Sequence, residues 1–246
     1  YPLPCEMLIS EMDRYGVDMA LVSNLEGAEF DSADPGRPIP IPQMELNRRT
    51  LECVRRHPDR LRGLFWIKPR NEGYTDEIEE FMAASRPLMA GFKAHPSLSL
   101  LAFDDVACEP YLRCAARLGA PVAVHSAPDD YADPSIVLRV ARAHPDVAFI
   151  MVHMGLGTDN TEAARYIREL PYLYGDTSWV TAEHVLDAVR ECGSGKILFG
   201  TDAPIDGEDT YRSYTGMIEL LRRELSAHEF DDVFRGNAVR LFGVEV

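Results

Sequence analysis

The sequence has no apolar run that approaches the roughly 18 residues needed to cross a membrane. It also has no basic segment followed by an apolar core near its start, so we expect no secretory signal peptide. Basic residues are in deficit: 25 Lys and Arg stand against 40 Asp and Glu, and the formal net charge is −15. Because such a charge repels phosphates and anionic lipid headgroups, neither nucleic acid nor a membrane is expected as a partner.

Cysteine is sparse, and no two cysteines form a Cys-x-x-Cys pair. The five are Cys5, Cys53, Cys108, Cys114 and Cys192. Their odd number and wide spacing predict neither a disulfide framework nor a structural zinc module. The pattern suits a reducing cytoplasm, where we expect the chain to be located.

What the chain does contain is a regular alternation of short apolar runs and longer amphipathic stretches. The runs typical of strands cover residues 19–23, 61–67, 89–95, 121–125, 147–153, 173–178 and 196–202. The helical patterns cover residues 5–15, 43–57, 76–84, 105–118, 134–143, 162–170, 182–192, 211–224 and 229–242. Four prolines between residues 26 and 42 predict a loop without regular structure.

This alternation predicts parallel strands covered by helices. Seven strands are one fewer than a closed barrel needs, and the sequence begins with a helical pattern. We therefore expect an α/β fold, a single (β/α)8 TIM-barrel domain over residues 1–246, whose first strand lies upstream of residue 1. An open doubly wound sheet is the competing fold. Its dinucleotide-binding form has little support, because no strand is followed by a Gly-x-Gly-x-x-Gly turn.

Polar residues stand where four of the predicted strands end: His95, His125, His153 and Asp202. In parallel barrels the carboxyl ends of the strands carry the chemistry. A lone histidine at a strand end is usually a packing residue, and Asp202 could simply cap a helix, but four converging positions favour a site. Imidazole and carboxylate together suit Zn²⁺ or a similar divalent ion.

Lys93 and His95 share one face of their strand, because residues two apart point the same way. Lys93 is expected to contact a substrate carboxylate or to form an ion pair with Asp176 or Asp202; bridging two metals as a carbamate is a further option. Arg37, in the proline-rich loop, is a second candidate for binding a substrate carboxylate.

Five segments together resemble a known family. They are Gly91-Phe-Lys-Ala-His-Pro96, Val124-His-Ser126, Val152-His-Met-Gly155, Leu198-Phe-Gly-Thr-Asp-Ala-Pro204 and Gly236-Asn-Ala-Val-Arg-Leu-Phe-Gly243. In this order they look like the amidohydrolase-related branch of the amidohydrolase superfamily. That branch contains metal-dependent hydrolases and decarboxylases of the aminocarboxymuconate-semialdehyde type.

The resemblance implies that His125 and Asp202 are metal ligands and that His153 lies beside the metal, as a further ligand or as the group acting on substrate or water. It implies one divalent ion, Zn²⁺ first and Mn²⁺ as the alternative. It also implies a first strand with a His-x-His pair, and nothing in the sequence matches that pair. Catalysis is expected from Asp202 and His153, and substrate binding from Lys93, His95 and Arg37.

The leading expectation is a hydrolase of a small, carboxylated ester, lactone or amide, in which Asp202 takes a proton from a metal-activated water. The alternative is a metal-dependent, non-oxidative decarboxylase of an aromatic or muconate-like acid. A third option is a homologue that has lost its metal and its activity. The expected partners are a small-molecule substrate and, as a further possibility, a second copy of the chain in a homodimer.

Overall fold

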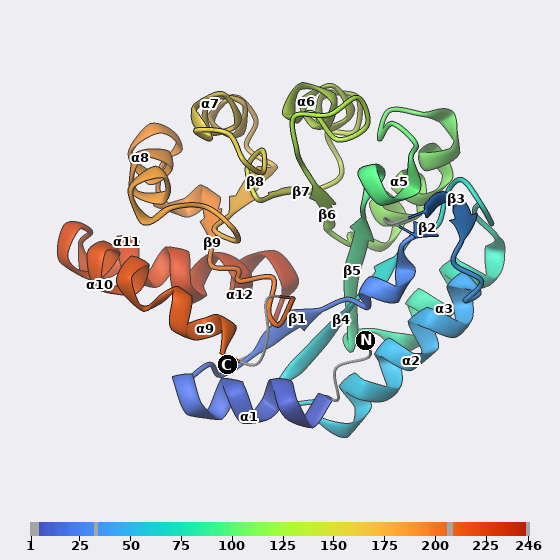
Figure 1. Cartoon of the computed structure of the whole chain (residues 1–246), viewed down its shortest axis with the longest axis horizontal. Coiled ribbons are helices and arrows are strands. Elements are labelled where there is room, and N and C mark those ends of the chain that lie inside the picture. The colour runs from blue at the N-terminus through green and yellow to red at the C-terminus, as the bar shows by residue number, and fades with distance from the viewer. Residues whose placement is uncertain (1–4, 32–33, 206–208, 245–246) are drawn as a thin grey trace.

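The computed structural model describes residues 5–31, 34–205 and 209–244, and its centre is a sheet of seven parallel strands. In spatial order they are β1 (Ala20–Val22), β4 (Leu61–Trp66), β5 (Met89–Ala94), β6 (Val122–His125), β7 (Phe149–Val152), β8 (Leu173–Asp176) and β9 (Ile197–Leu198). Figure 1 shows this sheet curled, with helices along its outer face. The fold is an α/β TIM-barrel-like fold, as predicted.

Strands β1 and β9 are the two edges of the sheet, so the described residues form a curled sheet and not a closed ring. The count of seven agrees with the sequence. No helix among them is long and apolar enough to span a membrane.

The predicted helices are present, with some divided into shorter elements. They are α1 (Cys5–Tyr15), α2 (Gln43–Arg56), α3 (Asp76–Ser85), α4 (Pro96–Ser99), α5 (Glu109–Leu118), α6 (Pro134–Ala143), α7 (Thr161–Glu169), α8 (Ala182–Cys192), α9 (Thr210–Ser213), α10 (Thr215–Glu224), α11 (Ala227–Asp231) and α12 (Asn237–Phe242). A π-helical segment, Asp232–Gly236, joins α11 to α12. The last predicted strand is shorter than expected, because β9 ends at Leu198.

The two faces of the sheet build separate apolar cores. On β6, Val122 and Val124 pack outward against the helices, while Ala123 points inward. The inner core combines one or two residues from several strands with the end of the chain: Leu64, Ala90, Ala123, Ile150, Val152, Leu198, Phe242 and Val244. Because side chains alternate along a strand, the residue after Val124, His125, returns to the inner face.

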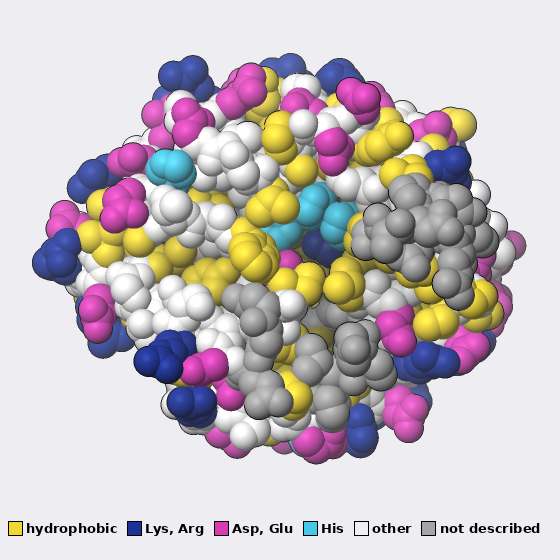
Figure 2. Space-filling view, viewed as in Figure 1, with side chains coloured by type: hydrophobic (Ala, Val, Ile, Leu, Met, Phe, Trp, Pro, Cys, Tyr) yellow, Lys and Arg dark blue, Asp and Glu magenta, His cyan; other side chains and the backbone are white. Residues whose placement is uncertain are grey.

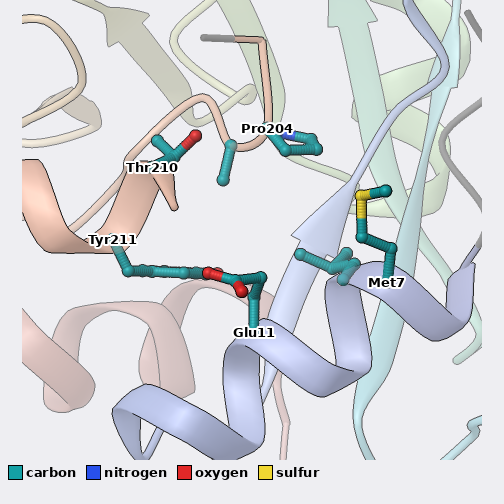
Figure 3. Close-up of a pocket in the computed structure, with 7 residues that line it drawn as sticks. Met7, Glu11, Pro204, Thr210 and Tyr211 are labelled. Carbon is teal, nitrogen blue, oxygen red and sulfur yellow. The ribbon is translucent and has the colours of Figure 1, made fainter. Parts of the chain in front are cut away.

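Helix α1 packs against the segment that follows β9. The rings of Tyr15 and Tyr211 lie 5.9 Å apart, and the Tyr15 hydroxyl donates a hydrogen bond to Asp209. Figure 3 shows Met7 and Glu11 of α1 facing Pro204, Thr210 and Tyr211 across a small pocket. Helix α1 thus lies beside Ala203 and Pro204, the two residues that follow Asp202.

Two expectations from the sequence are wrong. The proline-rich loop contains a short antiparallel pair, β2 (Phe30–Asp31) and β3 (Asp34–Pro38), so the prolines do not exclude strand structure there. Cys5 and Cys53 form a disulfide between α1 and α2 with their Cα atoms 6.0 Å apart. Tertiary packing brings these cysteines together across 48 residues, which their spacing could not reveal. The bond weakens the argument for a reducing cytoplasm.

Gly91 of β5 is required by close packing. A Cβ atom there would lie 2.6 Å from the carbonyl oxygen of Pro121 and 3.1 Å from Leu64 Cδ2. We expect Gly91→Ala to lower the free energy of unfolding by roughly 1–3 kcal/mol through overpacking. Chemical denaturation followed by circular dichroism measures the change.

Gly216 of α10 is the matched control, because a Cβ there meets no atom within 4 Å. We expect Gly216→Ala to leave the stability unchanged or to raise it by about 0.5–1 kcal/mol, as usual inside a helix. Equal destabilisation by both substitutions would contradict the packing argument.

Candidate active site

Three imidazole rings meet at the carboxyl ends of neighbouring strands. His125 is the last residue of β6, His95 follows β5, and His153 follows β7. The rings of His95 and His125 are stacked with centroids 3.8 Å apart, and His153 meets His125 edge-on at 4.9 Å. Figure 2 shows histidine side chains gathered around a hollow near the centre of this face. The structure thus brings the three predicted histidines together.

Trp66, the last residue of β4, extends this row of rings. Its indole stacks on His95 with centroids 5.8 Å apart and is 2% exposed. Four neighbouring strands therefore supply four adjacent rings, in the order Trp66, His95, His125 and His153. The faces of these four rings are apolar, and their only polar atoms are the ring nitrogens.

His153 reaches this wall through an unusual backbone conformation. Val152 already points into the inner core, so simple alternation would turn the next side chain outward. The φ angle of His153 is 67°, in the left-handed region that non-glycine residues seldom adopt. The same region holds Trp179 at 58° and Asp202 at 56°. Such backbone conformations cost free energy and are often found at functional sites, so their presence at this end of the sheet supports a functional site there.

Asp176 and Ser178, at and just after the end of β8, form hydrogen bonds with the backbone and the side chain of His153. Asp176 Oδ1 accepts a hydrogen bond from the His153 backbone N–H at 2.9 Å. The Ser178 hydroxyl lies 2.8 Å from His153 Nδ1 and donates to Asp176 Oδ1 at 2.6 Å. Ser178 is 1% exposed, so its hydroxyl is shielded from water, whereas Asp176 is partly exposed.

Asp202 lies beyond the end of β9, on an exposed turn, rather than at a strand terminus. Its Oδ2 atom accepts a hydrogen bond from Trp179 Nε1 at 3.0 Å. The Trp179 side chain is 46% exposed, so its indole offers an open aromatic face next to a carboxylate. This pairing was not predicted from the sequence.

Lys93 lies on the inner side of β5 and is only 8% exposed. Burial lowers the pKa of its amine, while the charges of Asp202 and Asp176 act in the opposite direction. Within the described residues no carboxylate oxygen forms an ion pair with Lys93. The Lys93 amine therefore lies near Asp176 and Asp202 but forms an ion pair with neither. Contact with a substrate carboxylate stays a prediction.

The histidines are held in their neutral forms. Burial lowers the pKa of His125 to about 2, with further contributions from the charges of His153 and Lys93. Burial likewise brings the pKa of His95 well below its ordinary value. It also lowers the pKa of His153, against the opposing charge of Asp176. Neutral imidazoles carry a free lone pair, which is what a metal ion or a hydrogen-bond donor requires.

The imidazole nitrogens and carboxylate oxygens at this rim are ligand types that bind divalent metal ions. His125 Nδ1 is buried and has no hydrogen-bond partner in the described part of the chain, so a ligand there would satisfy it. However, no three His, Cys, Asp or Glu side chains within residues 5–31, 34–205 and 209–244 stand together as a metal site. The described residues thus contribute part of a ligand set.

The remaining predicted residue, Arg37, lies in β3, and its side chain is outside the described residues. The structure adds four residues that the sequence analysis did not assign to the site: Trp66, Asp176, Ser178 and Trp179. Asp176 had been considered only as a partner of Lys93. Their one signal in the sequence is that they lie at or just after the end of a predicted strand: Trp66 in 61–67, Asp176 and Ser178 in 173–178, and Trp179 directly after it.

The chain has a curled parallel sheet with histidines, a lysine and aspartates at the carboxyl ends of its strands. This arrangement is typical of TIM-barrel-like enzymes. Within that class the chain belongs to the amidohydrolase family: a family model described as "Amidohydrolase" matches residues 8–244. No functionally curated protein matches the sequence.

Several solved structures share the fold. A 5-carboxyvanillate decarboxylase from Novosphingobium aromaticivorans, complexed with manganese and a nitrobenzoic acid, matches with TM-score 0.73 and 15% identity over 96% of this chain and 79% of its own. A 2,6-dihydroxybenzoate decarboxylase, complexed with 2,6-dihydroxybenzoate, matches with TM-score 0.71 and 19% identity over 96% and 87%. A probable 2-pyrone-4,6-dicarboxylic acid hydrolase from Acinetobacter baumannii matches with TM-score 0.68 and 16% identity over 99% and 90%. At such identities the likeness establishes the fold.

The lowered pKa values make stability depend on pH. An imidazole that stays neutral when folded but titrates near pH 6.5 when unfolded lets the unfolded state bind more protons in acid. The free energy of unfolding should therefore be highest above about pH 6.5 and fall by up to about 1.4 kcal/mol per pH unit and imidazole below it. We expect His95→Gln to make this fall less steep, measured by denaturation at several pH values.

His228→Gln is the control, because His228 is exposed on α11 and belongs to no buried cluster. It should leave the pH dependence as in the unsubstituted protein. Parallel curves for all three proteins would contradict the assignment to His95.

Proposed function

We propose that this protein is a metal-dependent, non-oxidative decarboxylase that acts on a small aromatic carboxylic acid. The observation that carries the proposal is the ring-lined rim, in which buried neutral imidazoles, an uncommitted amine and a carboxylate surround one hollow. Two decarboxylases described above are named for aromatic acids, and this likeness favours decarboxylation over the hydrolysis that the sequence analysis placed first.

Substrate binding would use the amine and the aromatic groups. Lys93 is a buried cation without an ion-pair partner in the described residues, so the substrate carboxylate can take that place. The exposed indole of Trp179 offers a face for the substrate ring, since aromatic pairs contribute about 0.5–1.5 kcal/mol beyond burial. His95 borders the same hollow, and Arg37 stays a proposed contact on the overhanging β2–β3 segment.

The reaction requires one proton. The bond between the ring carbon and the carboxylate breaks, carbon dioxide leaves, and the electron pair that stays on the ring takes up a proton. Asp202 and His153 are the proposed donors, because they follow β9 and β7, the strands on either side of β8, and so reach the same rim. Solvent can restore the proton on Asp202, whose side chain is exposed.

We propose His125, Asp202 and His153 as the residues of this chain that hold the metal. Mn²⁺ is the first candidate, since a decarboxylase neighbour was solved with it, and Zn²⁺ is the second. A bound divalent ion would supply positive charge that orients the carboxylate and hydroxyl oxygens of the substrate. His125 contributes the unpartnered Nδ1 atom, and Trp179 orients the Asp202 carboxylate.

Hydrolysis of a carboxylated lactone is the second candidate function. It is favoured by the neighbour described as a probable 2-pyrone-4,6-dicarboxylic acid hydrolase. In that reaction Asp202 would take a proton from the attacking water and Lys93 would still bind a substrate carboxylate. The two candidates therefore share residues and differ in the product that is released.

A product screen separates the candidates. The protein, incubated with Mn²⁺ or Zn²⁺, is offered 2,6-dihydroxybenzoate, 5-carboxyvanillate and 2-pyrone-4,6-dicarboxylate. We expect release of carbon dioxide from a benzoate, measured by a coupled assay, and no turnover after removal of the metal with a chelator. Ring opening of the pyrone without carbon dioxide would replace the first function with the second. If none of the three substrates is converted and the protein binds no metal, the result would support a non-catalytic homologue.

Asp202→Asn tests the proposed carboxylate. The substitution keeps the size of the side chain but removes its charge and its titratable proton. We expect turnover to fall by roughly 10²–10⁴-fold, as for other positioned acid–base groups. Asp187→Asn is the control, because Asp187 lies on the exposed side of α8, and it should retain full activity. Full activity of Asp202→Asn would remove Asp202 from the mechanism.

A further inference from the structure

One oxygen of Asp176 is the end point of three hydrogen bonds. Oδ1 receives the backbone N–H of His153 at 2.9 Å, the backbone N–H of Ser178 at 3.1 Å and the Ser178 hydroxyl at 2.6 Å. Backbone N–H groups can only donate, so this oxygen acts as the acceptor of the set. The single proton of the Ser178 hydroxyl is therefore committed to Asp176.

That commitment determines what Ser178 can offer to His153. With its proton directed at Asp176, the Ser178 hydroxyl presents a lone pair to His153 Nδ1, 2.8 Å away. The backbone carbonyl oxygen of Ser178, which can only accept, lies 3.2 Å from the same nitrogen. Two acceptors directed at one ring nitrogen require that nitrogen to carry the proton.

We propose that Asp176 and Ser178 are positioning residues that hold neutral His153 with its proton on Nδ1 and a free lone pair on Nε2. Within the described residues Nε2 makes no hydrogen bond, and the ring that carries it stands edge-on to His125. Resting on the proposed function, the assignment makes His153 Nε2 a hydrogen-bond acceptor for a substrate hydroxyl group or an electron-pair donor to the metal. The neutral ring has no proton on Nε2 to give.

The assignment separates the two proton donors left open above. With His153 removed as a donor, Asp202 is the residue of this chain that passes a proton from solvent water at the exposed rim to the ring carbon. His153 instead accepts the hydrogen bond of a substrate hydroxyl and holds the ring in place.

The test reads the tautomer directly and needs neither substrate nor metal. The protein is labelled with nitrogen-15 in histidine, and long-range proton–nitrogen spectra are recorded near neutral pH, with His153 assigned from the signals missing in His153→Gln. We expect Nδ1 of His153 in the range of protonated ring nitrogens and Nε2 in the range of unprotonated ones. A protonated Nε2 in the unsubstituted protein overturns the proposal.

Ser178→Ala tests the role of the hydroxyl. The variant keeps only the weaker carbonyl acceptor, so we expect a measurable fraction of the tautomer protonated on Nε2, and a roughly 10–100-fold loss of kcat/KM on any substrate found. Ser194→Ala is the matched control, because Ser194 also donates to an aspartate, Asp232, at 2.8 Å but contacts no histidine. An unchanged His153 spectrum in Ser178→Ala overturns the role of Ser178.

The outcomes for the tautomer and for the function are independent. If Ser178→Ala does not fold, the spectrum of the unsubstituted protein still decides where the proton lies. A spectrum as expected, combined with an inactive product screen, would reject the proposed decarboxylation and leave the positioning role standing. Carbon dioxide release combined with a protonated Nε2 would support the decarboxylase and reject the positioning role of Asp176 and Ser178.

Discussion

The alternation of side chains along parallel strands is the constraint on which the rest of this structure depends. On β6 it sends Val122 and Val124 to the helices and Ala123 and His125 to the interior. Because neighbouring strands run in register, as His125 does with Val152, the inward residues of several strands reach the same level. Apolar residues fill the lower levels, so the polar ones can gather only at the carboxyl rim.

Crowding at that rim has electrostatic consequences. Rings stacked as closely as His95 and His125 exclude water from one another, which disfavours the charged imidazolium. Lys93 adds positive charge from below and strengthens the same preference. The site thus combines neutral imidazoles with the buried amine of Lys93, which forms no ion pair within the described residues. Burial is the largest cause of the lowered pKa values, and the charges of Asp176 and Asp202 oppose it at His153 and Lys93.

Much of this arrangement follows from the sequence, and the parts that do not have physical reasons. Strand periodicity predicts the sheet and the inward direction of His125, because both depend on local alternation. The orientation of His153 depends on a left-handed backbone conformation, and Asp202 lies beyond its strand, also at positive φ, with Trp179 as its hydrogen-bond partner. The partners of His153 come from another strand, and the disulfide joins distant helices. Such contacts arise from packing and leave little trace in local spacing. The resemblance to a family supplied the ligand roles, which composition could not.

The distribution of indole rings has a practical consequence. The chain has two tryptophans, and both belong to the rim: Trp66 is buried against His95, and Trp179 is partly exposed and bonded to Asp202. Intrinsic fluorescence of this protein therefore originates almost entirely at one place. Emission wavelength and access to a quencher report on the hollow itself, so binding there can be followed without any attached label.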